Sequence, residues 1–159
     1  MNRGVAKRPL FEDRDDMRFF LARLARQVRA GRIEVHAYCL MTTHFHLLLR
    51  SPVGELSEAM RRVENEHSRH FNRRRKRDGT LIRGRYGSKP VKSVAYWRTL
   101  VAYIDANPIE AGLVRCSAEY PFGSAQAYMR PEGPIWLSRG LVERDACALT
   151  ASDRYSGSV

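Results

Sequence analysis

The sequence lacks the features of secreted proteins and of membrane proteins. It contains three cysteines, which lie far apart and form no CxxC pair: Cys39, Cys116 and Cys147. Neither a disulfide framework nor a zinc knuckle is therefore indicated, and a reducing cytoplasm fits best. The N-terminal segment has no apolar signal-peptide core, and no apolar run approaches the ~18 residues that are needed to span a bilayer. We therefore expect a cytoplasmic protein without a membrane partner.

Acidic residues are scarce relative to basic ones. The chain has 28 Lys and Arg against 17 Asp and Glu, which gives a formal charge of +11 and a pI of about 10.2. A solvated helix face usually mixes both signs, so a strongly basic segment favours a phosphate-binding surface and a nucleic-acid partner at the nucleoid. Between residues 61 and 92, three acidic side chains stand against twelve basic ones, which are our candidate DNA-binding residues: Arg61, Arg62, Arg69, Arg73, Arg74, Arg75, Lys76, Arg77, Arg83, Arg85, Lys89 and Lys92.

The hydrophobic periodicity predicts an α+β fold. Helices are expected at residues 16–30, 55–75 and 94–106, with Asp15 or Asp16 capping the first and Ser93 capping the third. The Asn107-Pro108 pair should end or bend the third helix, because a residue before proline disfavours helical geometry. The expected strands lie at residues 32–41, 44–50 and 90–92.

This order of elements corresponds to a ferredoxin-like antiparallel sheet with packed helices. Such a sheet needs one more strand before the first helix, where only a handful of residues is present, so we expect a truncated first strand. We predict one domain at residues 1–128, followed by a weakly structured C-terminal tail at residues 129–159 that is frayed from residue 148 onward.

Two histidines lie one residue apart at the start of an apolar strand. His44 and His46 flank Phe45 in the stretch TTHFHLLLR. Successive side chains of a strand point to opposite faces, so the two imidazoles share one face. Two neutral imidazoles side by side suit a metal ion. They are equally compatible with two half-exposed strand residues, and their spacing alone leaves both interpretations open.

A tyrosine and an asparagine lie four residues apart in the third predicted helix. Tyr103 and Asn107 therefore share one helical face. A tyrosine hydroxyl is a poor nucleophile at neutral pH, because the pKa of a tyrosine is near 10, but beside a divalent metal it becomes a credible one. An asparagine carbonyl oxygen is a neutral ligand for such a metal. The spacing is also compatible with a packed ring and a capping amide before Pro108.

Two stretches together resemble a known family. HAYCLMTTHFHLLLRSP followed by YIDANPIEAGLV is similar to the single-tyrosine HUH transposases, in particular the REP-associated tyrosine transposases. The name HUH denotes two histidines around a hydrophobic residue, here His44, Phe45 and His46. The resemblance covers about residues 2–128, and the family's tyrosine helix ends in a pattern that is matched here by Tyr103, Ile104, Asn107, Pro108, Ala111 and Gly112.

The resemblance implies a nuclease and strand transferase that acts on single-stranded DNA, with imperfect hairpins as targets. It implies that His44 and His46, with Asn107 as third ligand, hold Mg²⁺ or Mn²⁺. It further implies that Tyr103 attacks the scissile phosphate, giving a 5′-phosphotyrosine and a free 3′-hydroxyl. Relatives act as monomers or as homodimers, so both states are compatible with the sequence.

The chain departs from the family pattern at several positions. Thr42-Thr43 stands where the family commonly has Pro-Asn, while Ala102 and Glu110 stand where it often has arginine. These departures and the short first strand motivate an alternative function, a nucleic-acid-binding module that retains the fold and does not cut. A hydrolytic metalloenzyme is disfavoured, because no paired carboxylates accompany the two histidines.

Other polar and aromatic residues have simpler interpretations. We expect His36 to have a structural role, and His67 and His70, on the basic helix, to contact solvent or phosphate in preference to a metal. Tyr86 either stacks on an exposed base or seals the edge of the sheet.

Overall fold

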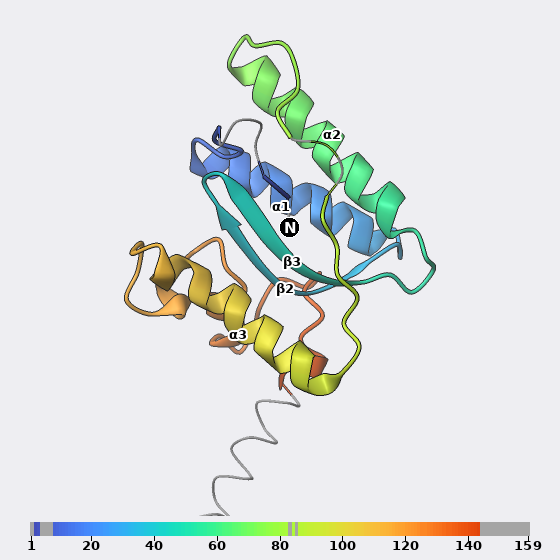
Figure 1. Cartoon of the computed structure of the whole chain (residues 1–159), viewed down its shortest axis with the longest axis vertical. Coiled ribbons are helices and arrows are strands. Elements are labelled where there is room, and N and C mark those ends of the chain that lie inside the picture. Colours follow the sequence, from blue (N-terminus) through green and yellow to red (C-terminus); the bar gives the residue numbers. More distant parts are fainter. Residues whose placement is uncertain (1, 4–7, 83, 85, 144–159) are drawn as a thin grey trace, which may run out of the picture.

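The computed structural model describes residues 2–3, 8–82, 84 and 86–143 (Figure 1). The α+β class with an antiparallel sheet packed against helices is confirmed. Among the described helices, none combines the length and the apolar character that crossing a bilayer requires. The elements are β1 (Asn2–Arg3), α1 (Arg14–Arg29), β2 (Glu34–Met41), β3 (His44–Arg50), α2 (Leu56–Arg74), α3 (Val94–Glu110), a 3-10 turn (Ser117–Glu119) and α4 (Ala125–Tyr128).

The sheet has three strands in the order β1-β3-β2. β2 and β3 form an antiparallel hairpin in which Met41 pairs with His44, so residues 42–43 alone make the connection. In the described residues, β1 pairs with the first two residues of β3, and the truncation of this strand stays a prediction. The predicted strand at residues 90–92 is wrong, because residues 86–93 form a connection without strand structure. A short stretch with no neighbouring strand to pair with cannot satisfy its backbone groups as a ladder.

The sheet separates two helical layers. α1 packs on α2 and lies on one side of the hairpin, whereas α3 lies on the other side and contacts both β2 and β3 (Figure 1). Phe45 of β3 packs its ring 4.8 Å from that of Phe20 in α1. The next residue, His46, places its ring 5.3 Å from that of Tyr103 in α3. The strand alternation therefore directs one residue into the core and the next toward α3.

The segment after α3 covers the outer edge of β2. Gly123 forms an antiparallel bridge with Cys39, and Leu137 forms a parallel bridge with Val35. Leu137 is buried in the core. Residues as far as 138 therefore contact the sheet, and the predicted boundary between residues 128 and 129 stays a prediction. The predicted fraying from residue 148 onward lies outside the described residues.

α1 begins earlier than the periodicity indicates. Its N-cap is Asp13, whose carboxylate accepts hydrogen bonds from the backbone N–H groups of Asp15 and Asp16. The predicted caps, Asp15 and Asp16, are therefore wrong. Asp16 is fully buried and its carboxylate accepts hydrogen bonds from Arg74 and Arg75 at the end of α2. Asp16 lies within the first turn of α1 and not at the cap position, and its carboxylate accepts hydrogen bonds from α2 and from the backbone N–H of Glu12.

His67 is a core residue, so the expectation that it contacts solvent or phosphate is wrong. Its side chain has 0 % exposure, and its Nε2–H donates to the backbone oxygen of Leu10 at 2.8 Å. The ring lies among Phe11, Phe20 and Phe71. Burial outweighs the hydrogen bond to Leu10 and lowers the pKa of His67 from 6.5 to about 4.

His67 should make the fold sensitive to acid. A folded-state pKa below the unfolded value means that its contribution to stability is complete above pH 6.5 and is lost as the pH falls toward 4. Between pH 7 and pH 4.5 the protein should lose about 2 kcal/mol more unfolding free energy than His67→Phe loses. Urea denaturation at both pH values measures the difference. Equal losses in the two proteins would contradict the assignment of a buried neutral imidazole.

Candidate active site

The two histidines of the HxH stretch lie at the start of β3 and face α3. Their ring centroids are 5.1 Å apart, with the ring planes at 89°. His46 is buried, with 7 % exposure, and His44 is partly buried. Phe45 between them is anchored in the core on the opposite face of the sheet. The two imidazoles therefore lie on one face of β3, as predicted.

Tyr103 meets this face from α3. Its ring lies edge to face against His46, with centroids 5.3 Å apart and planes at 89°. The side chain keeps 46 % exposure, so a bulky substrate has access to it. The helix that carries it begins as predicted, because the Ser93 hydroxyl accepts a hydrogen bond from the backbone N–H of Tyr96 at 3.2 Å.

The side chain of Asn107 forms hydrogen bonds to backbone carbonyls of α3 next to Pro108. Pro108 has no N–H, so the carbonyl of Ile104 lacks its usual helical donor. The side-chain amide of Asn107 donates to the carbonyl of Tyr103 at 2.6 Å and lies 3.5 Å from that of Ile104. α3 continues to Glu110, so the Asn107-Pro108 pair does not end the helix, and a bend at this pair stays a prediction. Because Nδ2 is bonded inside the helix, Oδ1 is the side-chain atom that is left as an acceptor.

The donor set suits a hard divalent cation. In the described part of the chain, no group of three or more His, Cys, Asp and Glu side chains could hold a metal. The predicted ligand set of His44, His46 and Asn107 is of another type, because its third member is an amide oxygen on the helix that contacts β3, and this set stays a prediction. His46 and Asn107 are both polar side chains with less than a tenth of their surface exposed.

A groove of about 1180 Å³ starts at this site. His46 and Tyr103 line it, and it continues between β3, α2, the first half of α3 and the connection at residues 86–93. Among the described residues that line it there is no Asp or Glu, whereas Lys89 and Lys92 are both exposed there. Tyr86 also forms part of its wall, with the hydroxyl 3.1 Å from that of Ser57. The groove is therefore lined mainly by apolar and aromatic side chains, is bordered by exposed lysines, and is continuous with the histidine–tyrosine contact.

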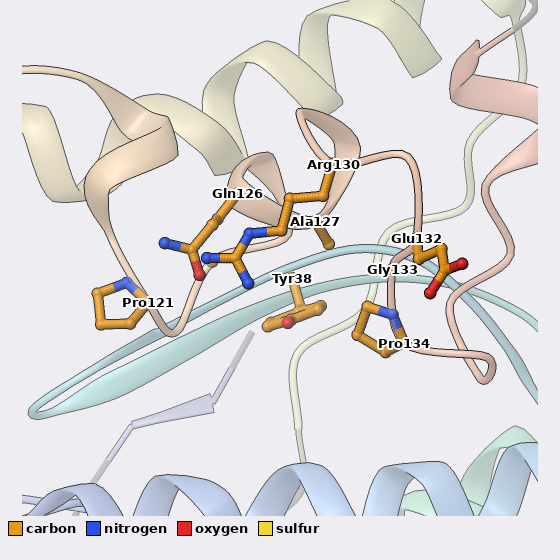
Figure 2. A pocket seen from close by; sticks show the side chains of 9 residues that line it. Tyr38, Pro121, Gln126, Ala127, Arg130, Glu132, Gly133 and Pro134 are labelled. Carbon is orange, nitrogen blue, oxygen red and sulfur yellow. The ribbon is translucent and has the colours of Figure 1, made fainter.

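A second, smaller cavity lies apart from this site. Figure 2 shows Tyr38 of β2 facing residues of the segment after α3, including Gln126, Arg130 and Pro134. Its volume is about 300 Å³, and neither the two histidines nor Tyr103 lines it. Of these two cavities, the larger groove is the one that His46 and Tyr103 line.

The candidate DNA-binding side chains fall into three groups. Some are paired with carboxylates: Arg61 and Arg62 with Glu58, and Arg74 and Arg75 with acidic residues of the α1 N-terminus. Others have no carboxylate partner within the described ranges and are exposed: Arg69, Arg73, Lys76, Lys89 and Lys92. Arg77 is partly buried beside the Phe71 ring, and Arg83 and Arg85 lie outside the described residues. A DNA contact by any of the twelve stays a prediction.

Sequence reasoning missed one partly buried carboxyl group on α3. Asp105 lies between Tyr103 and Asn107, and burial raises its pKa to about 6 although it accepts a hydrogen bond from the Ser124 hydroxyl. The signal in the sequence is an acidic residue within the otherwise apolar stretch AYIDA. Its partner Ser124 belongs to the segment over β2, so Asp105 faces away from the groove.

Comparison with known proteins gives one family and one solved structure. Residues 3–107 match the family described as "Transposase IS200 like", a stretch that includes the two histidines, Tyr103 and Asn107. No curated protein matches the chain. The fold is similar to that of a REP-associated tyrosine transposase bound to a REP hairpin, with a TM-score of 0.64 and 18 % identity over 86 % of this chain and 81 % of that one.

Proposed function

The chain belongs to the IS200-like transposase family, and on this premise we propose that it cleaves and rejoins single-stranded DNA through a covalent bond to Tyr103. The observation that carries the proposal is the contact between Tyr103 and His46, 5.3 Å between ring centroids, at the start of a groove lined by no described carboxylate. The proposed nucleophile and one candidate metal ligand, His46, therefore lie together at the start of a groove that exposed lysines border.

Tyr103 performs the covalent step. Its Oη forms a bond to the scissile phosphorus while the bond from phosphorus to the 3′ oxygen breaks. The tyrosine proton passes to solvent and the departing 3′ oxygen takes one up, which leaves a 5′-phosphotyrosine and a 3′-hydroxyl. Attack by another 3′-hydroxyl reverses the step and releases Tyr103, so rejoining needs no external energy source.

His44, His46 and Asn107 would hold the divalent cation that we infer for this reaction, Mg²⁺ or Mn²⁺. When bound, the cation supplies polarisation of the phosphate and neutralisation of its charge. Contacts within the protein hold these candidate ligands in position before a cation binds. Phe45 fixes the strand in the core, and the Asn107 amide is held by the carbonyl of Tyr103 at 2.6 Å.

We infer that the substrate is a single strand beside a DNA hairpin. The solved structure with a similar fold is described as bound to a REP hairpin. In this chain, the exposed Lys89 and Lys92 border the groove, and the ring of Tyr86 in its wall supplies an aromatic surface. Lysine contacts to phosphate combined with aromatic surfaces are the usual means of binding unpaired nucleotides.

The test is a denaturing gel of the protein incubated with Mn²⁺ and hairpin DNA that carries single-stranded flanks. A label on the 3′ end of the substrate should migrate with the protein, whereas a label on the 5′ end should appear on a short released fragment. EDTA should abolish both products. Tight, salt-sensitive binding without any adduct would instead indicate the non-cutting nucleic-acid-binding module.

Removal of the two groove lysines should reduce the salt dependence of binding. For single strands the slope of log K against log salt changes by about 0.7 per phosphate contact, so Lys89→Ala combined with Lys92→Ala should lower it by about 1.4. Fluorescence anisotropy at several salt concentrations measures the slope. Arg29→Ala removes an exposed charge from α1, across the sheet from the groove, and serves as the matched control. An equal loss of slope in both proteins would contradict a specific role of the groove.

A further inference from the structure

The turn before β3 makes a polar contact with the first histidine. Oγ1 of Thr43 lies 3.1 Å from Nδ1 of His44. Thr43 is partly buried, whereas the preceding Thr42 is exposed. These two threonines replace the Pro-Asn pair that is common in the similar transposases. The hydroxyl is thus a feature of this chain that the general HxH pattern does not include.

The backbone of this turn is fixed by the core. The carbonyl oxygen of Thr42 accepts hydrogen bonds from the N–H groups of Leu10 and Phe11, at 2.8 Å and 3.1 Å. Both of those side chains are fully buried. The carbonyl of Leu10 is itself held by His67. Thr43 therefore presents its hydroxyl from a backbone that has little freedom to move.

An imidazole binds a cation only through a nitrogen that carries a lone pair. In His44 the Nδ1 atom is turned toward Thr43, so coordination must use Nε2, and the proton must then lie on Nδ1. We propose that Thr43 is a positioning residue: its hydroxyl oxygen accepts the Nδ1–H of His44, which fixes both the tautomer and the orientation of the ring. This inference rests on the proposed function, because it assigns His44 to a cation site.

The first measurement uses the metal-free protein. Long-range ¹H–¹⁵N correlation spectra of a histidine ring show which nitrogen carries the proton when the ring is neutral. We expect Nδ1–H at His44 in the wild-type protein and in Thr43→Ser. In Thr43→Val, which keeps the branched shape and removes the acceptor, the Nε2–H tautomer should become populated. A wild-type His44 that carries its proton on Nε2 would overturn the proposal.

The second measurement is Mn²⁺ affinity, followed by electron paramagnetic resonance of the free ion. Loss of an outer hydrogen bond to a metal-binding histidine typically weakens binding by about 10–100-fold, which is the effect expected for Thr43→Val. Thr43→Ser should restore wild-type affinity. Thr42→Val is the matched control, because it changes the neighbouring side chain and keeps the carbonyl that holds the turn. Thermal melts of all variants identify any loss of folding.

The outcomes separate this inference from the proposed function. If His44→Ala weakens Mn²⁺ binding and Thr43→Val does not, only the role of Thr43 is overturned. If His44→Ala binds Mn²⁺ as the wild-type protein does, the cation site itself is wrong, and the inference about Thr43 falls with it. A loss in Thr43→Val that Thr42→Val shares would also overturn the proposal, because it would indicate a general effect of altering the turn.

Discussion

Replacement of Tyr103 by phenylalanine will remove the covalent protein–DNA product while the protein remains folded and still binds DNA. In the proposed reaction the hydroxyl oxygen forms the bond to phosphorus, so its loss should lower the rate of adduct formation by at least about 10³-fold. The ring would remain against His46, because the 5.3 Å contact between centroids involves no hydroxyl. A denaturing gel with end-labelled hairpin DNA and Mn²⁺ detects the adduct.

Tyr96→Phe provides the control for this experiment. Tyr96 lies on the same helix, seven residues before Tyr103, and is also exposed. Its replacement removes one hydroxyl and should leave adduct formation unchanged. Cleavage that persists in Tyr103→Phe would point to water as the nucleophile and would contradict the tyrosine mechanism. An adduct that persists would place the covalent bond on another side chain.

Replacement of Asp16 by alanine will cause the largest loss of stability that we expect from a single polar substitution. The Asp16 carboxylate is fully buried and accepts hydrogen bonds from Arg74, at 2.7 Å, and from Arg75. Its loss leaves two guanidinium groups without their buried partner. The expected decrease in unfolding free energy is about 3 kcal/mol, at the low end for buried ion pairs, because both arginines retain some access to water.

Asp15→Ala is the matched control for Asp16→Ala. Asp15 is the preceding residue and pairs with Arg18, but both side chains are about two-thirds exposed, so its loss should cost less than about 1 kcal/mol. Urea unfolding at pH 7 compares the two variants. Burial, the largest single influence, opposes ionisation of Asp16, yet the hydrogen bonds from Arg75 and from the Glu12 backbone N–H, together with the charge of Arg75, outweigh it, so the pKa of Asp16 is lowered. Its contribution is therefore present above pH 3.8 and is lost as the pH falls through the lower folded-state value. Equal effects of the two substitutions would contradict the role given to Asp16.

Features of the site that depend on local geometry could be predicted from the sequence. The shared face of His44 and His46 follows from the alternation of a strand, and the pairing of Tyr103 with Asn107 follows from the helical repeat. The Ser93 cap is likewise a local signal, and the structure confirms it. The orientation of the Asn107 amide could not be predicted: the helical repeat identifies Ile104 as the carbonyl without a donor, but the shorter hydrogen bond of the amide goes to Tyr103.

Features that depend on distant partners could not be predicted. The sequence favours Asp15 or Asp16 as the cap of α1, whereas the structure uses Asp13. Arg74, from the far end of α2, donates hydrogen bonds to both Asp13 and the buried Asp16, and no local pattern identifies this partner. A count of charges also cannot distinguish an arginine that contacts a carboxylate from one that faces solvent. The basic segment at residues 61–92 contains arginines that contact a carboxylate and arginines that face solvent.

The burial of His67 shows the same limit. The periodicity of α2 places it on the apolar side of the helix, between Val63 and Phe71, but a histidine in a basic segment favours a solvent interpretation. Its partner is the backbone oxygen of Leu10, 57 residues away. No side-chain pattern identifies a backbone acceptor at that distance in the chain, so only the folded structure reveals the contact.

Phe45 makes the histidine pair a rigid extension of the hydrophobic core. Because its ring is packed against Phe20, neither neighbouring imidazole can move relative to α1 without opening the packing beneath it. In the proposed reaction, the position of the histidines at the scissile phosphate would thus depend on packing between apolar residues of the core. Variation in the groove walls can retune which strand is bound without disturbing the histidines, whereas a change of volume under Phe45 would be transmitted directly to them.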